Sequence, residues 1–451
     1  MAQNALTLPQ QIARMETARL RSYAELLSFY QGAQWPGSAL GGRRRERRLT
    51  FNYAKSFVEK TASYLMSGMH SVVDAEDESP EGQERARRAE RALAEVAEQN
   101  NLAQLDFDTE IDASVLGDGA YKVTWDPTER RVRVSSPDVQ GLFVWWLGDD
   151  VSRIWRVASR YRLTPDEVEL AFGTKAPARR SSRANAVEVV EVWTAETFEL
   201  WLDNARVEEK ANPYGVIPFV IFPNVREPKQ FWGSSDLPAI RESVRELNRA
   251  LSQLSMILEL SGNPIAVLEN VTEAQDIAVQ PGAVWELPEK ARAYLLDLLQ
   301  GGGVQLHVDY VNLIYRTLHD LGETPRSAFG EGKSVSGVGL AMELDPLLKK
   351  VQRKRLIRTA AYQRRNELVL RILEQQTGVR YAPYRSRVVW GPVVPVDRSR
   401  LVEDERTLVS AGIHSRRRAA DELGVADPDA EFSRWLEEER SVEAGSENGR
   451  G

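Results

Sequence analysis

The stretch that decides the fold is LPAIRESVRELNRALSQLSMILEL, residues 237–260. Its apolar residues recur at alternating spacings of three and four positions: Leu237, Ile240, Val244, Leu247, Leu251, Leu254 and Leu258. Charged residues occupy other faces of the same segment. This spacing predicts an amphipathic helix with one apolar seam that must pack against other protein surface.

A second amphipathic helix is predicted for residues 304–321. Its apolar side carries Val304, Val308, Val311, Ile314, Leu318 and Leu321. Between the two helices, residues 261–303 contain several prolines and glycines, which predict a small mixed α/β unit. The two long helices are therefore expected to form an antiparallel hairpin, with the small unit at its tip. The seam can pack against neighbouring subunits of a ring or within a hairpin of the same chain, and its spacing leaves both open.

The region before this hairpin is predicted to contain helices and then strands. Helical patterns cover residues 8–30, 52–66, 84–98 and a continuation through 115, with Asn52 as a cap of the second helix. After Gly117-Asp118-Gly119 the pattern changes to alternating apolar and polar residues. We expect strands at residues 120–125, 131–134, 142–147, 153–160, 187–193, 197–202 and 217–222. A short helix should begin at Thr164.

The region after the hairpin begins with a glycine- and serine-rich loop, residues 323–339. A long helical pattern follows over residues 340–376, interrupted by Asp345 and Pro346. Proline within a helix removes a hydrogen bond, so a kink is expected there, with Asp345 able to cap the second part. A further strand within residues 383–397 and a helical tail over residues 400–440 complete an α+β protein.

The composition narrows the possible functions. The net charge of −7 argues against a protein that coats itself with nucleic acid. The absence of cysteine excludes disulfides and thiolate chemistry. Residues 1–10 show no secretory signal, and the most apolar run, residues 142–147, is far shorter than the roughly 20 residues of a membrane helix. We therefore expect a protein without a membrane partner, made and assembled in the cytoplasm.

No catalytic or metal site is expected. The four histidines show no metal-ligand spacing. Residues 330–334, GEGKS, resemble part of a phosphate-binding loop, but Ser327 occupies the position of its first glycine, and the segment joins two helices instead of following a strand. A phosphate-processing enzyme is thus the weaker reading, and no cofactor is predicted.

Several stretches, taken in order, resemble the portal proteins of tailed bacteriophages, of the SPP1-like family. The likeness is carried by residues 23–35, 52–68, 116–121, 223–248, 336–348 and 390–424. Typical examples are the Tyr30-Gln31-Gly32-Ala33-Gln34 turn and Asp345-Pro346-Leu347-Leu348. Each motif is weak alone, whereas their order over residues 20–440 is specific.

The resemblance implies a portal fold with the following parts. They are a mixed α/β wing (residues 1–233 and 339–398), two stem helices (234–261 and 304–321), a small α/β clip (262–303), a tunnel loop (322–338) and a helical crown (399–451). It also implies a ring of usually twelve subunits at one capsid vertex of the virion. The expected partners are double-stranded DNA in the channel, the terminase large subunit, major capsid and scaffolding proteins, and head-completion, adaptor or tail proteins.

Site residues follow from this assignment. Arg326, Lys333 and Ser334 are expected in the tunnel loop against DNA. A basic ring is expected from Lys349, Lys350, Arg353 and Lys354, with salt bridges between subunits as the alternative. Packing between subunits is expected for Leu237, Ile240, Val244, Leu247, Leu251, Leu254, Leu258, Val308, Val311 and Ile314. A competing class is another phage ring or scaffold-associated protein that has no DNA channel.

Overall fold

The computed structural model of the chain is described for residues 6–35, 48–77, 79–175, 186–262, 265–270, 290, 292–296, 303–331, 337–393, 398–425 and 431–436. The chain divides into two compact units, Met1–Trp390 and Gly391–Gly451. With 53% helix and 21% strand, it is an α+β protein, as predicted.

The first unit begins with five helices. They are α1 (Leu8–Ile12), α2 (Thr17–Tyr30), α3 (Tyr53–Leu65), α4 (Pro80–Gln99) and α5 (Leu102–Leu116). Asn52 caps α3, as predicted, by accepting a hydrogen bond from the Lys55 amide at 3.2 Å. The single helix predicted over residues 8–30 is wrong, because the backbone turns into the left-handed region at Glu16 and separates α1 from α2.

The strands form two main antiparallel sheets. The larger one has the order β4-β5-β6-β7-β8, and the smaller one β3-β2-β9. Their strands are β2 (Asp118–Asp126), β3 (Arg131–Ser135), β4 (Leu142–Leu147), β5 (Asp150–Leu163), β6 (Val187–Trp193), β7 (Thr197–Leu202), β8 (Ala205–Ala211) and β9 (Phe219–Pro223). The short helix α6 (Pro165–Phe172) begins after Thr164 as expected. Sequence reasoning missed β8, whose side chains are nearly all exposed and mostly charged, so that it lacks apolar alternation.

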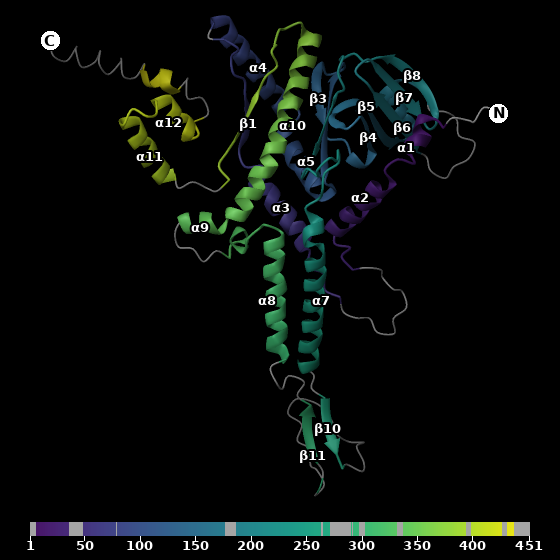
Figure 1. The fold of residues 1–451 in the computed structure, drawn as a ribbon, viewed down its shortest axis with the longest axis vertical. Helices are drawn as coiled ribbons and strands as arrows, with labels where there is room; N and C mark the ends of the chain where they lie inside the picture. Colours follow the sequence, from purple (N-terminus) through teal and green to yellow (C-terminus); the bar gives the residue numbers. More distant parts are fainter. Residues whose placement is uncertain are drawn as a thin grey trace, which may run out of the picture. The chain divides into compact units, whose positions relative to one another are not determined.

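The predicted stem helices are α7 (Leu237–Gly262) and α8 (Gly303–Leu321), which lie side by side (Figure 1). Two strands lie between these helices in the sequence, β10 (Ile265–Glu269) and β11 (Arg292–Leu296). They pair with each other in antiparallel orientation. Most of the predicted clip lies outside the described residues.

The predicted seam of α7 changes its surroundings along the helix. Leu237, Ile240, Val244 and Leu247 are buried in the main hydrophobic core of the chain, together with Ile314 of α8. The prediction that these five residues pack between subunits is therefore wrong, because side chains covered within one chain have no surface left for a neighbour. Leu251 and Val311 are partly buried against the same core, while Leu258 is exposed.

The long helical pattern after the loop is interrupted as predicted. It forms α9 (Gly337–Glu343) and α10 (Asp345–Thr377), with Leu344 between them. Pro346 lies in the first turn of α10, where an amide hydrogen has no helical partner and its loss costs little. The capping role expected of Asp345 is wrong: Leu344 occupies the cap position, and the Asp345 carboxylate pairs with Lys349 at 2.8 Å.

Helix α10 packs across the smaller sheet and builds the second core. Its residues Tyr362, Leu368 and Val369 are buried there with Tyr121 and Phe222. The strand predicted within residues 383–397 is β12 (Arg387–Trp390), which pairs with β1 (Met69–Val72). The first turns of α10 thus contact the stem region, and its later turns pack on the smaller sheet.

The second unit contains α11 (Arg398–Ser410) and α12 (Arg416–Glu422), with left-handed glycines at the predicted turns Gly412 and Gly424. Its basic run does not form a bare patch, because Arg416 stacks over Trp435 at 4.1 Å and Arg417 over Phe432 at 4.7 Å. Within the described ranges, no helix combines the length and the apolar character that crossing a membrane requires.

Candidate functional site

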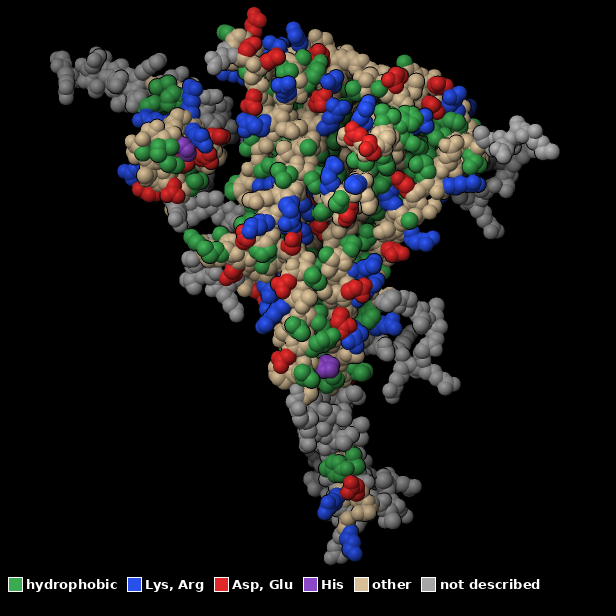
Figure 2. Space-filling model, in the orientation of Figure 1, with side chains coloured by type: hydrophobic (Ala, Val, Ile, Leu, Met, Phe, Trp, Pro, Cys, Tyr) green, Lys and Arg blue, Asp and Glu red, His purple; other side chains and the backbone are tan. Residues whose placement is uncertain are grey.

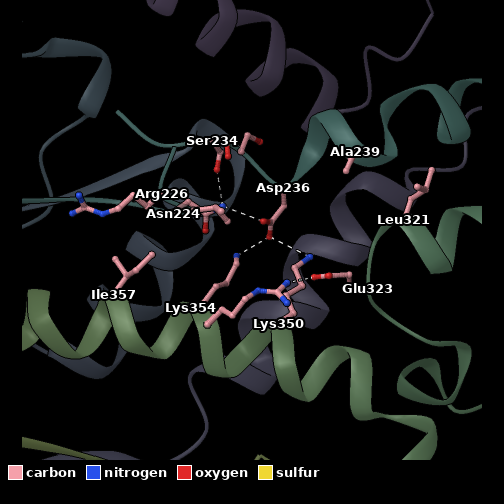
Figure 3. A pocket seen from close by; sticks show the side chains of 13 residues that line it. Asn224, Arg226, Ser234, Asp236, Ala239, Leu321, Glu323, Lys350, Lys354 and Ile357 are labelled. Atoms are coloured by element: carbon pink, nitrogen blue, oxygen red, sulfur yellow. Dashed lines mark hydrogen bonds and ion pairs between the residues drawn. The ribbon is translucent and has the colours of Figure 1, made fainter. Parts of the chain in front are cut away.

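The candidate site is the junction where the first turns of α10 meet the adjoining ends of both stem helices (Figure 3). Asp236 lies directly before α7 and accepts from Lys354 Nζ at 2.7 Å and from Asn224 Nδ2 at 3.0 Å. Lys350 Nζ lies 3.6 Å from the same carboxylate. Burial raises the pKa of Asp236, but the two lysines outweigh it and hold the pKa well below its ordinary value.

The same turns of α10 also hold the end of α8. Lys350 Nζ donates to the carbonyl oxygen of Gly322, directly after α8, at 3.1 Å, and the Thr324 hydroxyl donates to the same oxygen at 3.0 Å. One turn further, Arg353 pairs with Glu323. Three of the four cations that sequence reasoning placed in a DNA-binding ring, Lys350, Arg353 and Lys354, therefore connect α10 to residues at the ends of the stem helices within one chain.

A buried row of ion pairs extends from this junction between α10 and α5. Arg358 donates to Glu110 at 2.7 and 3.0 Å, and Lys354 lies 3.4 Å from the same residue. Further along α10, Arg365 pairs with Asp106. Burial lowers the pKa of Lys354, against the opposing influence of Asp236 and Glu110. Removing one partner of such a buried pair costs about 3–5 kcal/mol, so the row fixes α5 to α10.

These structural residues were missed by the sequence analysis. Nothing in the sequence pairs Asp106 and Glu110 with arginines about 250 positions later, since the contacts follow from the crossing of α5 and α10. The available signal was weak: Asp106 and Glu110 lie four residues apart on one side of α5, but the same helix also carries Asp108 and Asp112, so the sequence does not single out the buried pair.

The predicted basic ring needs correction. Lys354 is 2% exposed and cannot reach DNA, and Lys350 is mostly covered by its contacts with Asp236 and Gly322. Lys349 and Arg353 are exposed, and each pairs with a carboxylate of the same chain, Asp345 and Glu323. The alternative of salt bridges is therefore closer to the structure, although these bridges lie within the chain.

The predicted tunnel loop is described only in its first part, and Lys333 and Ser334 lie outside the described residues. Arg326 stacks over the ring of Tyr315 at 4.9 Å and pairs with Glu331. The turn itself is fixed by His319, whose Nδ1 donates to the Thr324 carbonyl at 2.6 Å. Burial lowers the pKa of His319, whose ring packs between Phe57 and Tyr315.

A wall of cations and apolar side chains encloses a pocket of about 450 Å³ at the junction. Its apolar lining includes Val225, Ala239, Leu321 and Ile357, and Figure 3 shows the last three of these. Among the described residues, no group of three or more histidines and acids is arranged to hold a metal ion.

A second feature is an apolar stripe on the outside of the stem. Four large side chains of α8 are exposed in the chain: Leu306 (71%), Tyr310 (41%), Leu313 (60%) and Leu321 (51%). Figure 2 shows hydrophobic side chains between charged ones over the stem. Sequence reasoning chose another stripe of α8, Val308, Val311 and Ile314, of which Val311 and Ile314 pack against the core.

The chain thus carries two long helices, α7 and α8, which pack on each other, and α8 keeps large apolar side chains exposed. Such a surface is typical of a subunit that assembles with other copies or partners. The family model described as "Phage portal protein, SPP1 Gp6-like" matches residues 10–444, nearly the whole chain. The chain therefore belongs to the phage portal protein family. No curated protein matches it. Membership implies a structural component of the capsid vertex that forms a homo-oligomeric ring, with capsid and terminase partners in general.

Proposed function

We propose that this chain is the subunit of a ring, usually of twelve copies, whose central channel passes double-stranded DNA during packaging and ejection. The proposed parts are the wing (residues 1–233 and 339–398), stem (234–261 and 304–321), clip (262–303), tunnel loop (322–338) and crown (399–451). The observation that carries the proposal is the exposed apolar stripe of α8 in a chain of this family.

We expect the exposed apolar stripe of α8 to be covered by a neighbouring subunit, because every subunit of a ring has such a neighbour. Leu306, Leu313 and Leu321 together expose apolar surface that favours association when it is covered. In a closed ring, one surface of each subunit meets a different surface of the next. The exposed half of α7, which carries Met256 and Leu258, is the complementary surface that we propose. Five of the residues predicted to pack between subunits are not fully buried within the chain and remain proposed in this role: Leu251, Leu254, Leu258, Val308 and Val311.

The charge of the proposed channel supports sliding of DNA. Duplex DNA carries roughly one charge per 1.7 Å, so a strongly basic channel would bind it tightly. The exposed Lys349 and Arg353 and the half-buried Arg326 each pair with an acidic residue of the same chain. These paired cations guide a polyanion weakly, and Lys333 and Ser334 remain proposed DNA contacts of the tunnel loop.

We propose the following partners: the terminase large subunit at the clip during packaging, scaffolding and major capsid proteins around the wing, and head-completion, adaptor or tail proteins afterwards. Assembly takes place in the bacterial cytoplasm, and the ring remains in the virion. The chain itself has no enzymatic role, because the packaging motor hydrolyses the nucleotide.

Electron microscopy of the purified protein, with and without DNA packaging by its motor, tests this function. Rings with a central opening, together with motor-dependent protection of DNA from nuclease in capsids that contain them, are expected. Rings without an opening would instead favour a phage ring or scaffold-associated protein that has no channel. Nucleotide hydrolysis by the purified chain would contradict its purely structural role.

A further inference from the structure

Helix α9 presents an apolar face that its own chain leaves uncovered. Val338 is 55% exposed and Met342, one turn later, is 73% exposed. These residues are four positions apart, so they lie on the same side of the helix. The only charged residue of α9 is the acidic Glu343. A short helix with such a face is stabilised when another surface covers it.

The pocket at the stem junction has the complementary properties. Its volume of about 450 Å³ can accept large side chains, and its rim includes the exposed apolar residues Val225 and Leu321. Its wall carries four cations, Arg226, Lys350, Arg353 and Lys354, against the two acids Asp236 and Glu323. The excess of positive charge favours an occupant that combines apolar side chains with an acidic one.

We propose that Val338 and Met342 of one subunit insert into this pocket of the adjacent subunit in the ring. The occupant is a second copy of this chain, because one sequence carries both the apolar, acidic helix and the apolar, cationic pocket. A contact between two different surfaces of identical subunits is the type that closes a ring. This inference rests on the proposed ring and assigns the contact that links neighbouring subunits beside the tunnel loop.

The contact has a mechanical consequence. The pocket wall is formed by Lys350 and Arg353, which hold the ends of α7 and α8 in their own subunit. Helix α9 directly follows the predicted tunnel loop of the other subunit. The contact therefore links the residues that follow the predicted tunnel loop of one subunit to the pocket that holds the stem helices of the next.

Disulfide crosslinking tests the contact cleanly, because the chain contains no cysteine. The double variant Met342→Cys/Val225→Cys is assembled into rings, oxidised and separated under denaturing, non-reducing conditions. A ladder of covalent dimers, trimers and larger species is expected, and it should disappear on reduction. The variant Met342→Cys/Ala239→Cys provides a second geometry across the pocket, since disulfides form only over short Cα distances of about 4.4–6.8 Å.

The matched control is Met342→Cys/Leu170→Cys, because Leu170 on α6 is 89% exposed and lies outside the pocket. No ladder is expected from it or from Met342→Cys alone. Rings that give only monomers in both pocket variants would overturn the contact while leaving the ring function intact. Dimers from Met342→Cys alone would overturn it too, since α9 would then meet its own copy. Absence of rings in the unmodified protein would instead count against the proposed function.

Discussion

The two halves of α7 continue the same heptad pattern but have different surroundings. The apolar side chains of residues 237–250 lie in the core of the chain, and Leu247 is 1% exposed. Leu251 still packs against this core, whereas further along the helix Leu258 is 53% exposed. The same apolar spacing therefore serves two purposes in α7. The first half packs within its own subunit and anchors the stem, and the second half leaves apolar side chains exposed that a neighbouring subunit can cover. Four predictions test this division, from the largest expected effect to the smallest.

The anchored half depends most on the buried ion pairs of α5 and α10. Glu110→Ala leaves Arg358 and Lys354 buried without their shared carboxylate, and should lower the free energy of unfolding by about 3–5 kcal/mol. Urea unfolding of dilute subunits measures this change. Glu84→Ala is the control, because its pair with Arg91 is exposed and should change stability by less than about 1 kcal/mol. Equal effects of the two variants would mean that the buried row does not anchor the helices.

The same substitution can be placed in each half of α7. Leu247→Ala creates a cavity in the core and should cost about 2–5 kcal/mol in subunit stability. Leu258→Ala removes a side chain that is exposed in the subunit, and should change its stability by about 0.5 kcal/mol or less. Thermal and urea unfolding compare the two. A large loss from Leu258→Ala in dilute subunits would contradict the division.

A substitution on the exposed surface of the stem should weaken ring assembly and leave the stability of the single subunit unchanged. Leu313→Ser on the exposed stripe of α8 leaves the subunit stable but removes apolar area from the proposed interface. Loss of a buried leucine contact of about 1.5–3 kcal/mol raises the concentration needed for ring formation by roughly ten- to a hundredfold. Analytical ultracentrifugation measures the shift. Unchanged assembly would show that the stripe does not lie between subunits.

The last prediction concerns how stability depends on pH in the acid range. The pKa of Asp236 in the folded chain lies below its ordinary value of 3.8. Its ion pairs therefore contribute stability above pH 3.8, and this contribution is lost as the pH falls towards the folded pKa. The stability difference between the native chain and Asp236→Asn should be constant near pH 6 and shrink below pH 4. A difference that stays constant into acid would contradict the assignment of the Asp236 charge.

Sequence periodicity predicted the stem helices, most strands and the interruption at Pro346, because these depend on local spacing and on the missing proline amide. It did not predict which half of α7 is covered by the rest of the chain, since Leu247 and Leu258 belong to the same regular pattern of apolar residues. It also assigned Lys354 to DNA contact, because the sequence does not show that Glu110 and Asp236 converge on it. The exposed Leu306 and Leu313 of α8 were missed because the apolar residues on another side of that helix gave an equally regular pattern.

The most direct test is the structure of the assembled protein by electron microscopy at side-chain resolution. We predict a closed ring around an open channel, in which Leu306, Leu313 and Leu321 of α8 are covered by the second half of α7 from the next subunit. A ring in which these side chains remain in solvent, or a stable monomer at every concentration, would contradict the account.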